Sequence, residues 1–358
     1  MRLPPSYVNT PPSDNGDVAY IYDDAVTIIA LLKRGTSEDV SRAVIMGNAI
    51  VYAQQHDPIG DGRVRDQYHT DPFIEPSGKV NIDGGSDEGE GSDTGNMAWT
   101  GLALIQLYHA TNDVSFLNAA TSLGNFIQNN DYATNGAGGY TGGINYKYKK
   151  ITYKSTEHQI DLYGFFSMME QATGDSATWG SYAQHALTEL LALWNSSGGY
   201  YWIGTDNNGV TINKTGDPTP EDVNTWSYLS TELADHEQSI DWVNKTLQIT
   251  SGTFKGVAFD TGDIKRGKCC TGVWFEGTAH TAAALKLRNL PGDDTLASSY
   301  ISDIEYAQTN GLNSNGLGII AASINGLEAD FDKYYADLHV GATAWYGLAA
   351  LGGNPFRF

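Results

Sequence analysis

Pairs of helical segments recur along this chain at intervals of about 50–70 residues. Apolar residues in each segment repeat with the helical period, and strand signals are confined to the connections. The predicted pairs are residues 23–33 with 37–55, 95–109 with 113–129, 157–171 with 176–194, 222–233 with 236–249 and 274–287 with 294–309, followed by a single helix at 340–351. A repeat of this length predicts stacked helical hairpins, arranged as a closed ring or an open solenoid.

The two members of each pair differ in composition. Residues 95–104 read GNMAWTGLAL and residues 341–350 read GATAWYGLAA, so small and apolar residues lie on nearly every side of these helices. A helix that is apolar all round is buried by its neighbours. The second members, such as residues 176–194, have one polar face. We therefore expect the first members to form six inner helices and the second members to form at least five outer ones.

This arrangement predicts an all-α fold, an (α/α)6 barrel in one domain over residues 1–358, with residues 1–19 as an N-terminal extension. No Pro- or Ser-rich linker divides the 358 residues. The sixth outer element is missing, irregular or supplied by the N-terminal segment.

Links within a pair are short, whereas links to the next pair are long and carry short β-hairpin signals, as at residues 198–213. All long loops therefore emerge at the N-terminal ends of the inner helices, a rim where function is expected.

Polar and aromatic residues gather at these helix starts. Trp and Tyr rings stack on the flat faces of sugars, while Asp, Asn and His side chains hydrogen-bond the hydroxyls. The sequence therefore predicts a carbohydrate site at the rim. The candidate substrate-binding residues are Tyr22, Asn96, Trp99, His158, Trp202, Asp222, Trp226, Trp274, His280, Asp332, Tyr334, Tyr335 and His339. For Trp99 and Trp226 a core role is the alternative.

Carboxylates at the same rim are the candidate catalytic groups. Glycoside hydrolysis needs one carboxyl group as an acid and a second carboxylate as a base or nucleophile. Glu157 and Asp161 share one helical face, so their mutual repulsion would raise one pKa. Glu276 follows two aromatic residues that would desolvate it. The order of candidates is Glu157, Asp161, Glu276, Asp24 and Asp93, with helix capping as the alternative role, above all for Asp93.

Charge and composition exclude several classes of partner. The net charge of −21 argues against nucleic acid, which binds clustered basic side chains, and favours a monomer. No apolar run is long enough to span a membrane. The start of the chain lacks a signal peptide, and secretion or a periplasmic location is expected if such a signal has been removed. The adjacent Cys269 and Cys270 are either free thiols or a vicinal disulfide.

Three kinds of site have open alternatives. The three histidines of the rim lack a paired spacing for metal binding, so no metal ion or other cofactor is predicted there. The acidic loop from Asp83 to Asp93 is either a mobile loop or a calcium site. Basic residues at 147–154 and 265–268 either balance nearby acids or attract a uronate-bearing polysaccharide.

Four rim segments, TGNMAWTGLAL at 94–104, YKSTEHQIDLY at 153–163, WFEGTA at 274–279 and HVGATAWY at 339–346, resemble bacterial proteins of the six-hairpin glycosidase superfamily. The resemblance spans residues 20–356, nearly the whole chain. It implies an (α/α)6 barrel with its site at the inner-helix N-termini and inverting hydrolysis by carboxylates. The superfamily fold also hosts polysaccharide lyases and sugar epimerases, so the fold does not decide the reaction.

The leading functional prediction is a glycoside hydrolase that acts on a polysaccharide or oligosaccharide with inversion at the anomeric carbon. The second is a polysaccharide lyase, in which Tyr or His removes a proton beside a uronate carboxyl group. The third is a non-catalytic glycan-binding protein, in which the carboxylates only hydrogen-bond the sugar.

Overall fold

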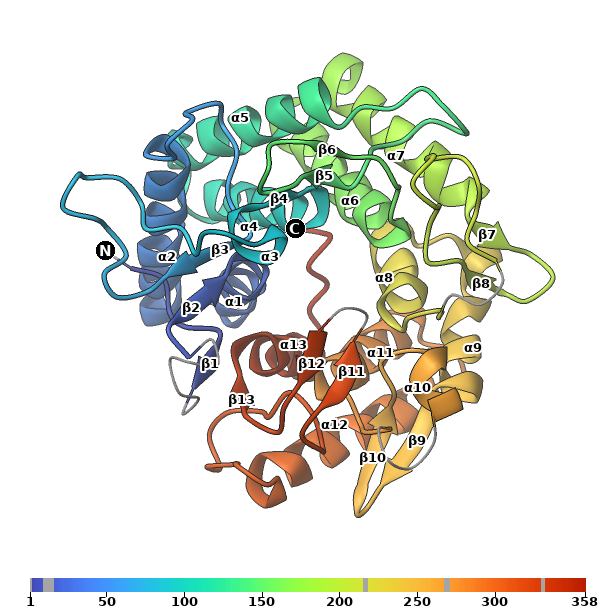
Figure 1. The fold of residues 1–358 in the computed structure, drawn as a ribbon. Helices are drawn as coiled ribbons and strands as arrows, with labels where there is room; N and C mark the ends of the chain where they lie inside the picture. Colours follow the sequence, from blue (N-terminus) through green and yellow to red (C-terminus); the bar gives the residue numbers. More distant parts are fainter. Residues whose placement is uncertain (1, 9–15, 215–217, 267–270, 330–331) are drawn as a thin grey trace.

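The computed structural model describes residues 2–8, 16–214, 218–266, 271–329 and 332–358, without the side chains of residues 87, 88 and 332. Six inner helices form a closed ring, since each one contacts the next and the last contacts the first. They are α1 (Ile21–Arg34), α4 (Thr94–Thr111), α6 (Thr156–Thr173), α8 (Asp222–Thr231), α11 (Phe275–Arg288) and α13 (Val340–Leu351). Figure 1 shows this ring from its loop face. The predicted (α/α)6 barrel is therefore confirmed, and the open solenoid is wrong.

Five outer helices pack around the ring, each next to the inner helix that precedes it. They are α2 (Ser37–Gln55), α5 (Val114–Asn130), α7 (Ser181–Ala192), which continues a π-helical turn at Ser176–Gly180, α9 (Gln238–Thr246) and α12 (Asp293–Asn310). Small residues allow the inner helices to pack closely against one another. A Cβ on Gly101 of α4 would lie 2.5 Å from the Phe165 ring of α6. Glycine at this position therefore lets the two helices pack directly.

The remaining elements are short and lie in the connections. Two more short helices are α3 (Asp87–Glu90) and α10 (Thr261–Arg266). The strands are β1 (Tyr7–Val8), β2 (Val18–Tyr20), β3 (Gln67–His69), β4 (Ser92–Asp93), β5 (Gly143–Ile144), β6 (Lys150–Ile151), β7 (Trp194–Asn195), β8 (Tyr200–Tyr201), β9 (Gln248–Ser251), β10 (Phe254–Val257), β11 (Leu327–Ala329), β12 (Asp332–Tyr334) and β13 (Leu338–His339). All strand pairings are antiparallel, and β1 pairs with β13, so the first residues join the last strand beside the final inner helix.

The centre of the ring is filled with aromatic side chains. Trp226 and Trp345 stack with their centroids 5.7 Å apart, and Trp99 meets both rings edge-on. Phe356, near the C-terminus, packs 5.2 Å from Trp99, and Asn354 donates a hydrogen bond to the carbonyl of Leu229 at the end of α8. The C-terminal segment therefore closes the barrel at the end opposite the rim. No described helix is long and apolar enough to cross a membrane.

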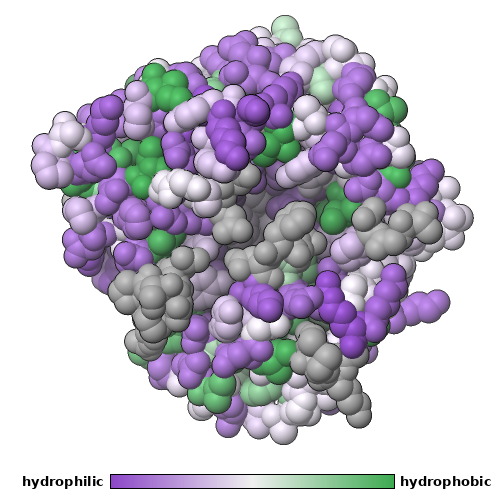
Figure 2. All heavy atoms as spheres, viewed as in Figure 1, coloured by the Kyte–Doolittle hydropathy of each residue, from purple (hydrophilic) through white to green (hydrophobic). Residues whose placement is uncertain are grey.

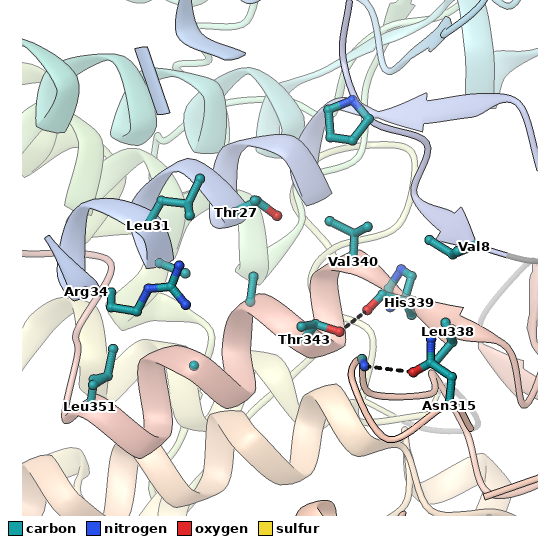
Figure 3. A pocket seen from close by; sticks show the side chains of 15 residues that line it. Val8, Thr27, Leu31, Arg34, Asn315, Leu338, His339, Val340, Thr343 and Leu351 are labelled. Carbon is teal, nitrogen blue, oxygen red and sulfur yellow. Dashed lines mark hydrogen bonds between the residues drawn. The ribbon is translucent and has the colours of Figure 1, made fainter. Parts of the chain in front are cut away.

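One position of the outer ring holds no helix among the described residues. The gap lies between α13 and α1, where an apolar groove of about 440 Å³ runs along both helices. Leu31 and Arg34 of α1 lie on one side of the groove, and Thr343 and Leu351 of α13 lie on the other (Figure 3). The expectation of an incomplete outer ring is met at this groove.

Candidate active site

A cavity of about 260 Å³ lies at the N-terminal ends of the inner helices. Figure 2 shows the loop face hollowed near its centre, with hydrophilic side chains around the hollow. The cavity is lined by Tyr7, Tyr20, Tyr22, Asp23, Asn96, Glu157, Asp222, Trp226, Phe259, Trp274, Glu276, Ala329, Lys333, Tyr334 and His339. Four carboxylates and seven aromatic rings therefore face one space, which is the composition of a sugar site.

One wall of the cavity contains carboxylates and imidazoles in alternation. Glu276 is in the first turn of α11 and is buried. Its Oε2 lies 3.4 Å from Nδ1 of His339, and Nε2 of His339 lies 3.2 Å from Oδ2 of Asp23. Its Oε1 accepts a 2.5 Å hydrogen bond from the Tyr22 hydroxyl and lies 3.7 Å from Nε2 of His280. Glu276 is thus held between two imidazoles and a phenol.

These contacts fix the charges of this wall. Burial disfavours charge on Glu276, but the imidazoliums of His339 and His280 outweigh burial and lower its pKa. Burial likewise opposes charge on His280, yet Glu221 and Glu276 raise its pKa to about 9. The pKa of His339 is also raised, because Asp23 and Glu276 outweigh its burial. These shifts favour a Glu276 carboxylate beside a protonated His280, and they favour the protonated form of His339 as well.

The opposite wall has the reverse character. Asp161 of α6 is fully buried, and neither of its carboxyl oxygens has a hydrogen-bond partner. Burial raises its pKa well above the ordinary value, and the nearby carboxylates of Glu157 and Asp222 raise it further. Glu157 lies one turn before Asp161 and lines the cavity, as does Asp222. These three carboxyls, named here the α6–α8 carboxyl group, therefore favour the protonated form of Asp161.

A glycine allows this group to approach the neighbouring helix. A Cβ on Gly95 of α4 would lie 2.6 Å from Cδ2 of His158 and 3.3 Å from Oδ2 of Asp161. His158 is buried there, and burial lowers its pKa to about 4. The imidazole is therefore neutral and does not compensate the Asp161 carboxyl.

The structure brings nine of the predicted site residues to the cavity, namely Tyr22, Asn96, Glu157, Asp222, Trp226, Trp274, Glu276, Tyr334 and His339. Others are buried without lining it: Asp24, Trp99, His158, Asp161 and His280. Asp93 is the N-cap residue of α4. Trp202 lies after β8 and Tyr335 is exposed, both away from the cavity lining. Asp332 lies in β12, and its side chain is outside the described residues.

Sequence reasoning missed two acidic residues of the site region, Asp66 and Glu221, and it selected Asp24 in place of its neighbour Asp23. Asp23 rather than Asp24 lines the cavity, and adjacency in a helix start could not distinguish them. Asp66 comes from the α2–β3 connection, accepts hydrogen bonds from Asn96 and the Asp93 amide at 2.8 Å, and has its pKa raised by burial and by Asp93. Glu221 directly precedes α8 and bonds His280. No local pattern marked Asp66 or Glu221, because their partners come from distant helices.

Two residues of the basic loops, Lys154 and Arg266, balance nearby acids. Lys154 is fully buried and forms an ion pair with Glu189 at 3.1 Å. Arg266 pairs with Asp263 and Glu328 at 2.9 Å each. These contacts favour the charge-balancing alternative for both positions. Lys268, Cys269 and Cys270 lie outside the described residues, so the state of the two thiols stays a prediction.

Two places could attract a cation. Donor atoms of Asp23, Glu276 and His339 lie within 4.8 Å of one another, but both nitrogens of the His339 ring already face the two carboxylates. The backbone N–H of Ala342 also donates to Nδ1 of His339 at 3.3 Å, and the absence of a metal ion at this group stays a prediction. In the acidic loop from Asp83 to Asp93, Asp83 lies 3.4 Å from Nε2 of His69 and Glu90 accepts a hydrogen bond from Tyr148. Calcium in this loop stays a prediction.

Solved structures share this fold across nearly the whole chain. A D-mannose isomerase superposes with a TM-score of 0.65 at 11% identity, over 94% of this chain and 87% of that one. A GH76 α-mannanase of Bacteroides thetaiotaomicron gives 0.64 at 12% identity, over 95% and 87%. A cellobiose 2-epimerase of Spirochaeta thermophila gives 0.66 at 9% identity, over 95% and 86%. No protein-family model and no curated protein matches the chain in sequence. The likeness confirms the (α/α)6-barrel fold.

Proposed function

We propose that this (α/α)6 barrel is a carbohydrate-active enzyme that hydrolyses glycosidic bonds in a polysaccharide or oligosaccharide. The observation that carries the proposal is that two carboxyl groups on opposite sides of the cavity have pKa values shifted in opposite directions. Glu276 has a lowered pKa, while Asp161 in the α6–α8 carboxyl group has a raised one. Carboxyl groups whose pKa values are pushed apart across one cavity are suited to act as base and acid.

In the proposed reaction the α6–α8 carboxyl group supplies the acid. Glu157 delivers the proton to the glycosidic oxygen, since it lines the cavity and Asp161 does not. The bond between the anomeric carbon and that oxygen breaks, and water attacks the anomeric carbon. Glu276 takes one proton from the attacking water, so a second hydroxyl forms on the other product. Proton exchange with solvent then restores both walls. This assignment corresponds to an inverting mechanism.

The aromatic lining supports a sugar as the substrate. Trp274 and Tyr334 stack with centroids 5.9 Å apart, and Phe259 packs against Trp274 at 4.8 Å. Trp274 directly precedes α11, Tyr334 lies in the β11–β12 hairpin and Phe259 lies in the β10–α10 connection, so three loop regions contribute apolar faces to one cavity. Asn96 provides an amide beside them for a hydroxyl group.

Product analysis on a panel of neutral and uronate-containing glycans tests the proposal. We expect new reducing ends without ultraviolet absorbance, and we expect Glu157→Gln and Glu276→Gln each to lower kcat by roughly 10²- to 10⁴-fold with little change in glycan binding. New absorbance from an unsaturated uronide would establish a lyase instead. Binding to both variants and to the wild type without any product would indicate a glycan-binding protein.

A second candidate is the isomerisation or epimerisation of a free sugar. It is favoured by His339, an imidazole that lines the cavity between two carboxylates and could move a proton at a carbon atom. Similar structures include a D-mannose isomerase and a cellobiose 2-epimerase. Incubation of free aldoses in heavy water distinguishes the candidates, since proton transfer at carbon would place deuterium in the sugar and hydrolysis would not.

A further inference from the structure

Glu221 is a buried carboxylate that does not line the cavity. It directly precedes α8 and has no solvent exposure. Its Oε1 accepts a 2.7 Å hydrogen bond from the Thr281 hydroxyl, and its Oε2 lies 3.0 Å from Nδ1 of His280. Its side chain makes no capping bond to α8, although it is the N-cap residue. Both carboxylate oxygens are therefore directed at α11, which carries Glu276.

His280 connects Glu221 to Glu276. Its Nε2 points to the Glu276 side at 3.7 Å from Oε1, so the ring lies between two carboxylates. Three tryptophans surround the ring: Trp345 at 4.2 Å, Trp226 at 4.9 Å and Trp274 at 5.2 Å between centroids. These indoles keep water away and restrict rotation of the ring. A carboxylate that bonds one ring nitrogen fixes the proton and the direction of the other.

We propose that Glu221 is a positioning residue for the reaction, which acts through His280 to hold the Glu276 carboxylate in its place at the cavity. This inference rests on the proposed function of Glu276 as the base. Without Glu221 the buried ring would lose the charge that opposes its desolvation, and Nδ1 would have no acceptor. The pKa of His280 would then fall, and its cationic form would stabilise the Glu276 carboxylate less.

Other groups also face this pair and limit the effect. Tyr22 donates a hydrogen bond to Glu276 from α1, and His339 of α13 faces Glu276 from the other side. Asp23 lies behind His339. They remain in a Glu221 variant, so Glu276 should keep part of its stabilisation. The change should therefore reduce activity and shift its pH dependence rather than abolish it.

Glu221→Gln tests the proposal, because the amide keeps the shape and can still accept from Thr281 while the charge is lost. The first measurement is the titration of the His280 ring in the unliganded protein by NMR. We expect the pKa of His280, which is about 9 in the wild type, to be clearly lower in the variant. The second measurement is the pH profile of kcat on the glycan that the wild type cleaves. We expect kcat to fall roughly 10- to 100-fold and its acidic limb to move to higher pH, with KM nearly unchanged.

Two control variants separate positioning from structural support. Thr281→Val removes one hydrogen bond of Glu221 but keeps its charge, so the His280 titration should stay close to that of the wild type. Asp235→Asn removes an exposed charge just after α8 and should change neither readout. If Glu221→Gln lowers thermal stability while His280 titrates as in the wild type, the proposal is overturned. The NMR result needs no substrate, so it is independent of whether the protein hydrolyses glycans.

Discussion

At the scale of single residues, two glycines of α13 have opposite surroundings. A Cβ on Gly341 would overlap Oδ1 of Asp23 and lie 2.9 Å from Oε2 of Glu276, whereas a Cβ on Gly347 would meet nothing within 4 Å. Gly341→Ala should therefore destabilise the protein by about 1–3 kcal/mol and disturb the Asp23–His339–Glu276 contacts. Gly347→Ala is the matched control on the same helix and should stabilise it by about 0.5–1 kcal/mol. Urea unfolding measures both, and equal effects would contradict the packing argument.

Asp161 gives a second prediction at this scale. Its pKa is raised by burial and by Glu157 and Asp222, so its contribution to stability is present at acid pH and is lost as pH rises through the folded pKa. Asp161→Asn should therefore gain stability relative to the wild type between pH 5 and pH 8. Asp113→Asn is the control, because hydrogen bonds from Ser115 lower the pKa of this exposed carboxyl. This substitution should lower the free energy of unfolding more at pH 8 than at pH 3. Urea unfolding at these pH values decides, and a pH-independent offset for Asp161→Asn would contradict the assignment.

At the scale of elements, a buried ion pair fastens a rim loop to the outer ring. Lys154, just before α6, donates hydrogen bonds to Glu189 of α7 and to the carbonyl of Asn135. Removal of one partner leaves the other charged and buried. Lys154→Met should therefore lower the free energy of unfolding by about 3–5 kcal/mol.

Thermal and urea unfolding measure this loss. The control is Lys149→Met, a basic residue of the same connection that is exposed, and it should change stability by less than about 0.5 kcal/mol. The double variant Lys154→Met with Glu189→Leu should recover much of the loss, since no uncompensated charge remains. Equal destabilisation by the single and double variants would show that the contact is not electrostatic.

At the scale of the whole molecule, the buried titratable groups set how stability varies with pH. The pKa values of Asp24, Asp66 and Asp161 are raised by burial, and Asp131 is raised to about 7. Carboxyls and histidines with raised pKa values bind protons more tightly when folded, so stability falls as pH rises. Exposed carboxylates with lowered pKa values stop contributing to the stability of the folded protein below about pH 4.

The free energy of unfolding should therefore decline from about pH 6 toward pH 9, where His280 also loses its proton, and it should also fall toward pH 4, where the buried His158 becomes protonated. Denaturant unfolding across this range measures the curve. Repulsion within the net charge of −21 also lowers the free energy of unfolding as pH rises. Added salt should reduce this repulsion and leave the effect of the buried groups unchanged, which distinguishes the two contributions. A maximum above pH 8 would contradict the raised pKa values.

The sequence by itself determined the architecture of the molecule. Helical periodicity, all-round apolar segments such as 95–104 and alternating short and long links each report local interactions, and together they predict a ring with its site at one rim. The same reasoning identified Glu157, Asp222, Trp274, Glu276 and His339 as rim residues, since each lies at or near the start of an inner helix. In the structure all five residues line the cavity.

Only the tertiary structure decided which neighbours these residues have. Ring closure places Glu221, His280, Glu276, His339 and Asp23 in one chain of contacts, although they come from four different helical segments. It also placed Asp23 rather than Asp24 in the cavity and buried Lys154 beside Glu189. Charge and pKa depend on distances of a few ångströms between segments that are far apart in sequence. Periodicity reports which face of a helix is buried, but not which side chain of another helix lies against it.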